Sequence, residues 1–325
     1  MILRFTEYCN DDCVTDLDMV NESLSISDSA IKESEKVLDF IKDAINNGKV
    51  TEVSRTDQGR ILRFVDNPVI KVYGCDCELD FTFFEFYGRP STDDLKGKFG
   101  NANTKFHVSD NGGVTTVNFK ISYDSVIIVN GSIHEFSRGI IAHELMHAYI
   151  DQKIYNNVPS WSAIKTQSKL KKWYQIYSIS VKYIDLYQSN IFTRFIDGEY
   201  FYEMLFNIYR SDVTEIAAFT QQAYEDCKSC KTLNEIKNKI KKTDLYMIKV
   251  ALENCLKIME RDDIKEYYNN TKINYGVSND LPSIYQLTKL FTKRYNKVTS
   301  NIGKVITYLD YELDGGKKIG TIVRY

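Results

Sequence analysis

Residues 125–150 read SVIIVNGSIHEFSRGIIAHELMHAYI, and this stretch decides the fold around it. The apolar run at 125–130 is typical of a buried strand. No residue from Ile140 to Ile150 breaks a helix, and Ser137 is a suitable N-cap for one. The stretch therefore predicts a strand that leads directly into a helix starting at Ser137.

The segments before this stretch predict one helix and a small sheet. Residues 29–46 place apolar side chains on one helical face, and Asn47-Gly48 follows as a suitable helix stop. Beyond Gly48 the apolar period changes to two, which is the period of strands. The expected strands are TEVSR at 51–55, RILRFV at 60–65 and VIKVYG at 69–74, with a hairpin of FHVSD at 106–110 and VTTVNFKISY at 114–123 around Asn111-Gly112.

The segments after the stretch are mainly helical in pattern. Apolar residues at helical spacing occur at 173–184 and again at 284–295. Residues 305–325 have the pattern of two strands around a turn at 314–316. Together these patterns predict an α+β fold, with a small antiparallel or mixed sheet and a mainly helical part. The expected parts are 1–136 and 137–325, the second ending in a β-hairpin, and together they form one unit.

Composition limits the classes of partner. The chain has 325 residues, of which 43% are hydrophobic, so it can bury a substantial core. Lysine and arginine number 42 against 44 acidic residues, which gives a formal net charge of -2. No electrostatic footprint points to nucleic acid or to an anionic membrane surface. We therefore expect neither nucleic acid nor membrane as a partner.

The first residues, MILRFTEYCNDDC, place acidic side chains before any apolar run, and no later stretch approaches the length of a membrane span. We expect a soluble, cytoplasmic protein whose seven cysteines are reduced thiols. An alternative is a structural zinc ion held by four thiolates, although short-spaced cysteine pairs also arise by chance. The four cysteines of this alternative are Cys75, Cys77, Cys227 and Cys230.

His143, Glu144 and His147 form an HExxH motif inside the predicted helix. Residues four apart on a helix differ by only about 40° in direction, so both imidazoles can bind one ion. Glu144 can reach a water molecule bound to that ion. Because Zn2+ lowers the pKa of a bound water toward about 7, a carboxylate beside it can remove the proton. The motif predicts one catalytic zinc ion, with Glu144 as the general base.

Chance is the weaker explanation of this motif. The chain has four histidines, so random placement of HExxH is on the order of a few in a thousand. The residues that flank the motif are also uncharged, as a helix buried behind a metal cleft requires. They are Ile140, Ile141, Ala142, Leu145, Met146, Ala148 and Tyr149.

The block around the motif resembles the active-site helix of the zincin metallopeptidases, over about residues 115–225. In that family the helix follows a strand that lines the substrate cleft, and the run at 125–130 takes this place here. The resemblance implies zinc-dependent hydrolysis of a peptide or protein substrate. It also implies that the substrate lies extended along the 125–130 strand.

The third zinc ligand separates the zincin branches. Metzincins extend the motif as HExxHxxGxxH, but Ile150 and Lys153 replace the glycine and the last ligand, and no histidine follows His147. The gluzincin branch remains, and it implies a carboxylate ligand on a downstream helix. Glu215 is the best candidate, because the alanines at 217–218 allow that helix to pack closely.

Other interpretations of this region stay open. Asp212-Val-Thr-Glu215 also fits a capping box, in which Glu215 only satisfies a backbone N–H group. Glu199, Glu203 and Asp212 are alternative oxygen ligands. Gluzincins usually carry an acidic residue four positions after the glutamate ligand, where this chain has Phe219, so the surroundings of the ligand must be built differently.

His134 precedes His143 in the expected loop before the helix, where a loop or surface role is simpler than a ligand or transition-state donor. His107 is assigned no role. A second functional hypothesis is a zincin fold used as a structural or assembly component, for example in a phage virion, with zinc bound and catalysis unused. It is motivated by the expected absence of a signal or propeptide. The intact Glu144 favours the peptidase.

Overall fold

The computed structural model divides the chain into two compact units. The sheet unit consists of Ile26–Asn157 and Ala217–Thr232, and the helical unit of Met1–Ser25, Val158–Ile216 and Leu233–Tyr325. The structure describes residues 28–91, 94–95, 100–111, 114–156, 207, 210–211, 213–263, 265–266, 269 and 283–314.

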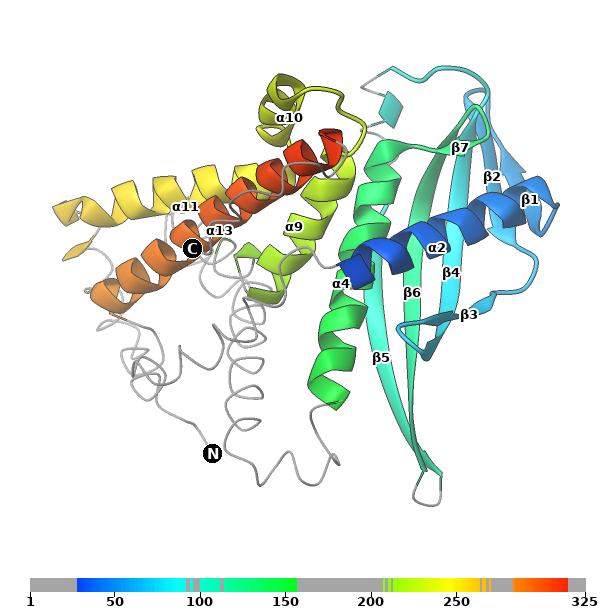
Figure 1. Cartoon of the computed structure of the whole chain (residues 1–325), viewed down its shortest axis with the longest axis horizontal. Helices are drawn as coiled ribbons and strands as arrows, with labels where there is room; N and C mark the ends of the chain where they lie inside the picture. Colours follow the sequence, from blue (N-terminus) through cyan, green and yellow to red (C-terminus); the bar gives the residue numbers. More distant parts are fainter. Residues whose placement is uncertain are drawn as a thin grey trace. The chain divides into compact units, whose positions relative to one another are not determined.

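The sheet unit is built on a mixed sheet of seven strands, which confirms the α+β prediction (Figure 1). The strands are β1 Val50–Arg55, β2 Gly59–Phe64, β3 Val69–Val72, β4 Cys75–Phe86, β5 Ala102–Asn111, β6 Val114–Val129 and β7 Ser132–Ile133. The order is β1-β2-β4-β6-β5, with β3 paired to β4 and β7 paired to β6. β4 and β6 are parallel, and the other pairs are antiparallel. β5 and β6 form the predicted hairpin.

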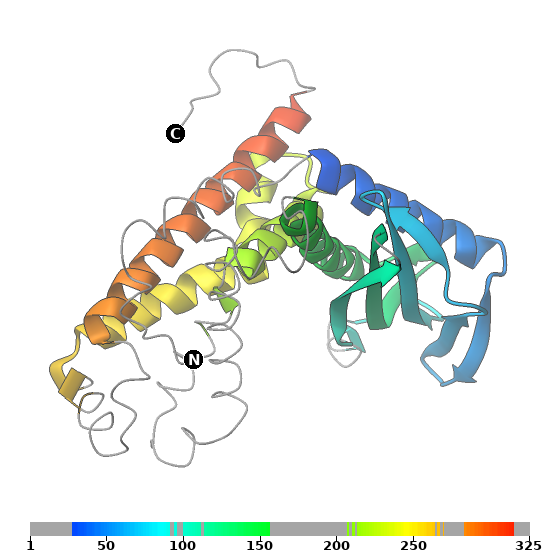
Figure 2. The same cartoon turned by 90° about the horizontal axis from the view of Figure 1, so that it is seen from below.

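Helices α2 (Asp28–Asn46) and α4 (Glu135–Asn156) pack against the same face of this sheet (Figures 1 and 2). Alternate residues of β4 and β6 supply the sheet side of this core, as the two-residue period of strands requires. The α4 side chains in the core are Ile141, Leu145 and Ala148. α4 is therefore fixed to the sheet along one stripe of its surface.

α4 belongs to the same compact unit as the sheet, so the predicted boundary between residues 136 and 137 does not separate the units. The chain enters α4 through a tight turn. Asn130 and Gly131 join β6 to β7 with positive φ angles of 51° and 72°, as a two-residue hairpin turn requires. α4 belongs to the sheet unit because it needs the sheet face to bury its apolar stripe.

The strand at 125–130 does not lie at an edge of the sheet. It is the second half of β6, which lies between β4 and β5 in the strand order. The backbone N–H of Ile127 donates to Ser137 Oγ at 2.8 Å, and its carbonyl accepts from the His134 N–H at 2.8 Å. These groups are therefore not available to a peptide. The 125–130 strand is thus not a sheet edge, because β7 pairs with Ile128 and Val129, whereas β5 pairs with the first part of β6 and ends the strand order.

The start of α4 also differs from the prediction. The helix begins at Glu135, and His134 precedes it as the cap, with its Nδ1 accepting from the Phe136 N–H at 3.3 Å. Ser137 lies inside the first turn and is fully buried. Its hydroxyl oxygen accepts a hydrogen bond from the Ile127 N–H and also lies 3.3 Å from the Tyr123 hydroxyl. Ser137 therefore anchors α4 to β6 and is not an N-cap.

Replacing Ser137 by alanine is expected to lower the free energy of unfolding by about 1–3 kcal/mol, because the buried Ile127 N–H loses its acceptor. Urea unfolding of the two proteins measures this difference. Ser132→Ala, at an exposed position of β7, is the matched control and is expected to change stability little. Equal effects of the two substitutions would contradict the anchoring role.

Three helices follow α9 (Val213–Cys227) in the described part of the helical unit. They are α10 Leu233–Ile240, α11 Asp244–Glu260 and α13 Ile284–Leu313. α13 begins with a capping box, in which Ser283 Oγ and the Gln286 side chain satisfy each other's backbone N–H groups. α10 and α11 both contact α13. No helix among the described residues is long and apolar enough to cross a membrane.

The predicted helix at 284–295 is confirmed, but it continues to Leu313, so the strand predicted from residue 305 is wrong. Val298, Val305 and Leu309 are buried at helical spacing, and this stripe outweighs the β-branched character of the segment. The rest of the predicted C-terminal hairpin, at 315–325, lies outside the described residues, as does the helix predicted at 173–184.

Candidate metal centre

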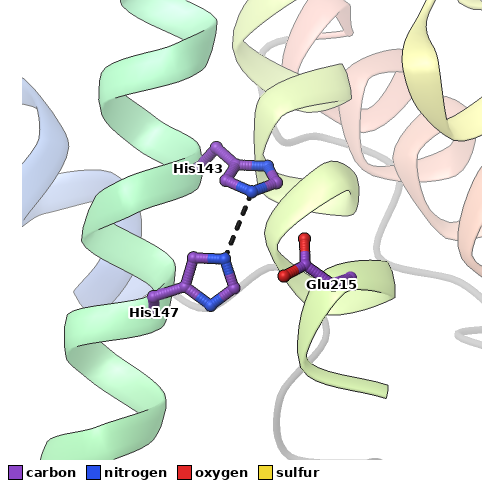
Figure 3. Close-up of side chains that lie close together, drawn as sticks. All are labelled: His143, His147 and Glu215. Carbon is purple, nitrogen blue, oxygen red and sulfur yellow. Dashed lines mark hydrogen bonds between the residues drawn. The ribbon is translucent and has the colours of Figure 1, made fainter. Parts of the chain in front are cut away.

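The two histidines of the motif lie on α4, on the side opposite its sheet-packed stripe. Both side chains are half-buried. Their Nε2 atoms are 3.2 Å apart, and the rings are inclined at 72° with centroids 4.9 Å apart (Figure 3). The helix repeat alone produces this arrangement, since residues four apart share a face. The predicted pairing of His143 and His147 is thus present in the structure.

Glu215 joins the two histidines from the first turn of α9. One carboxylate oxygen of Glu215 and one nitrogen of each imidazole all lie within 4.8 Å of one another, and the carboxylate is directed toward the histidines (Figure 3). Within the described part of the chain, these three residues form the one group of histidine, cysteine or acidic side chains that could hold a metal ion. The alternatives Glu199, Glu203 and Asp212 lie outside the described residues.

Phe219 occupies the position four residues after Glu215, where gluzincins usually carry an acidic residue. It lies one turn after Glu215 on α9, and its ring meets the imidazole of His143 edge-on, with centroids 4.5 Å apart and an angle of 66°. The ring restrains the orientation of the imidazole by packing, and it adds no charge to the site. The surroundings of the histidine are therefore aromatic at this point.

A close approach of two helices sets the position of α9 next to α4. A Cβ atom at Gly139 would overlap Asp226 Oδ1 and lie 3.1 Å from Gln222 Cγ, so α9 packs directly on the α4 backbone at this point. An ion pair reinforces the contact, with Arg138 Nη2 3.5 Å from Glu225 Oε2. Glu215 lies in the first turn of the same helix.

Gly139→Ala should therefore weaken zinc binding and lower the melting temperature, although alanine normally stabilises a helix interior by about 1 kcal/mol relative to glycine. Zinc titration and thermal unfolding measure the two effects. Gly303→Ala in α13 is the matched control, because a Cβ atom there meets nothing within 4 Å and should stabilise the helix. A gain in stability at Gly139 as at Gly303 would contradict the close approach.

Glu225 is a buried carboxylate within this helix contact. Its side chain is fully buried, and burial raises its pKa above the ordinary value near 4.5, although Lys228 and Arg138 oppose the shift. Lys228 also pairs with Glu35 of α2 at 2.6 Å. The fold therefore favours the protonated form of Glu225 more than the unfolded chain does.

The pH dependence of stability follows from this raised pKa. The contribution of Glu225 is fully present below the ordinary carboxyl pKa and is lost as pH rises through the raised pKa of the folded state. In Glu225→Gln this loss is expected to be absent. Melting temperatures of both proteins from pH 3.5 to about 8 should show the variant gaining on the wild type as pH rises. A constant difference across the range would contradict the shift.

Glu144 has a different environment from the two histidines. It is buried, with 7% of its surface exposed. Thr104 Oγ1 of β5 lies 2.8 Å from Glu144 Oε2 and 2.9 Å from the carbonyl oxygen of the same residue. The carboxylate is therefore held at the junction of α4 with the edge strand.

The remaining sequence candidates do not join the site. His134 caps α4, and His107 lies in β5. Within the described part of the chain, the cysteines do not assemble into a metal-binding group. Burial raises the pKa of Cys77 to about 12, which disfavours the thiolate that a zinc ligand requires. The four-thiolate alternative is thus unsupported.

Sequence reasoning did not find Thr104, Gly139 or the contact made by Phe219. Gly139 carried a usable signal, because a glycine inside a helix often marks a close approach of another backbone or side chain. Thr104 carried no such signal, since its role depends on which strand lies beside α4.

Comparison of the chain with protein-family models, with curated proteins and with solved structures gave no match.

Proposed function

We propose that this chain is a zinc-dependent metallopeptidase in which His143, His147 and Glu215 hold one zinc ion and Glu144 is the general base. The observation that carries the proposal is the convergence of the three side chains from two helices. Two nitrogen ligands at about 2.0–2.1 Å from a tetrahedral zinc ion are about 3.3–3.4 Å apart. The Nε2 separation of 3.2 Å fits this spacing closely.

Zinc, when bound, lowers the pKa of a water molecule and polarises the carbonyl group of the substrate. Glu144 would take one proton from the attacking water as the water oxygen bonds to the carbonyl carbon. When the C–N bond breaks, Glu144 returns the proton to the leaving nitrogen, so that the products are a carboxylic acid and an amine. The burial of Glu144 keeps bulk water from competing for this proton.

The substrate side of the proposal rests on β5. Among the described strands, β5 pairs with β6 alone, so its other edge is the place for an extended peptide to add as a further strand. Asn103 and Lys105 are exposed on this strand, and Thr104 between them contacts Glu144. A peptide paired with β5 therefore lies beside the proposed base.

Purified protein is expected to bind about one zinc ion per chain and to cleave casein or a peptide library. Glu144→Gln should abolish cleavage and retain zinc, because it removes the base and keeps the ligands. His143→Ala should lose the metal, and Glu215→Ala should weaken zinc binding by more than the 10- to 100-fold typical of indirect partners. Metal analysis, zinc titration and product detection measure these outcomes.

Two outcomes of this experiment separate the alternatives. Cleavage that survives Glu144→Gln would overturn the mechanism. Zinc binding without cleavage above the Glu144→Gln control would instead support the alternative of a zincin-like component of a larger assembly, such as a virion, with catalysis unused. In that case His143→Ala should impair assembly or stability, and Glu144→Gln should not.

A further inference from the structure

Thr104 connects the edge strand to the proposed base. Its partner in the β5–β6 register is Ile121, which lies in the core between the sheet and the helices, so Thr104 also faces α4. Its hydroxyl lies 2.8 Å from Glu144 Oε2 and 2.9 Å from Glu144 O. Side chain and backbone of one residue are thus both within reach of one hydroxyl group.

The hydroxyl has a single proton, so only one of these two oxygens receives a strong hydrogen bond at a time. A carboxylate is the better acceptor, because a hydrogen bond to an ionised group is shorter and stronger than a neutral one. The carbonyl of Glu144, in mid-helix, also accepts the regular helix bond from four residues later. In the carboxylate form that a general base requires, Glu144 Oε2 is therefore the preferred acceptor of the Thr104 proton.

We propose that Thr104 is the positioning residue of the general base. Its hydrogen bond holds the Glu144 side chain in one rotamer, at the junction of α4 and the edge strand. A free glutamate side chain has several rotamers, and it must give up this freedom before it can act from one reactive position. This inference rests on the proposed peptidase function and goes beyond it, because it makes β5 part of the catalytic geometry as well as the substrate-binding edge.

The role of Thr104 has a direct consequence for substrate binding. A peptide that pairs with β5 fixes the backbone of the strand from which Thr104 projects. The position of the hydroxyl, and with it that of the Glu144 carboxylate, then becomes better defined. Extended substrates should therefore have a higher kcat as well as a lower KM, and truncated substrates should have a lower kcat.

The test uses Thr104→Val, which keeps the shape of the side chain and removes the hydroxyl, and Thr104→Ser, which keeps the hydroxyl. Thr104→Val is expected to lower kcat by about 10- to 100-fold, a part of the 10²–10⁴ that general-base catalysis supplies. KM and the zinc content should change little. Thr104→Ser should restore kcat to within about threefold of the wild type. Thr51→Val, at an exposed position of β1, is the matched control and should leave kcat unchanged.

Three results would overturn the positioning role. The first is a wild-type kcat in Thr104→Val, and the second is an equal loss in Thr104→Ser and Thr104→Val. The third is an absence of any Glu144-dependent cleavage in the wild type, which overturns the proposed function together with this inference. Melting temperature and zinc content, measured on each variant, identify a loss of kcat that comes from unfolding, and such a loss counts against the positioning role.

Discussion

The close approach of α9 to α4 at Gly139 is the constraint on which the candidate site depends. With no side chain at this position, the Asp226 side chain of α9 lies against the α4 backbone. Phe219 and Glu215 lie on the same side of α9, seven and eleven residues before Asp226, because such separations are close to whole helical turns. Glu215 therefore lies about three turns before Asp226 on the same helix.

The short contact between the two imidazoles restricts their protonation. Their Nε2 atoms are 3.2 Å apart, which in the absence of an ion requires one ring to donate and the other to accept. A cation between them removes this requirement, since both nitrogens can then donate a lone pair to the metal. Under the proposed function, two neutral imidazoles and the Glu215 carboxylate would balance half of the charge of a zinc ion.

The sequence predicted what local periodicity determines. The α+β class, the α4 helix and the pairing of its two histidines follow from spacing along a single segment. Strand order was not accessible, because it depends on pairing between distant segments. The sequence therefore did not show that 125–130 has β4 on one side and β7 on the other. Ser137 shows the same limit, since a hydroxyl suited to an N-cap serves instead as a tertiary acceptor for Ile127.

The burial of Glu144 bears on the two functional hypotheses. Burying a carboxylate costs free energy unless it is hydrogen-bonded, and the Thr104 hydroxyl is one group that holds its side chain. A glutamine or an apolar residue of similar size would fill the same position of α4 at lower cost. A helix used only for structure has no reason to keep the ionisable group, whereas a general base requires it. This asymmetry favours the proposed peptidase over an assembly role in which catalysis is unused.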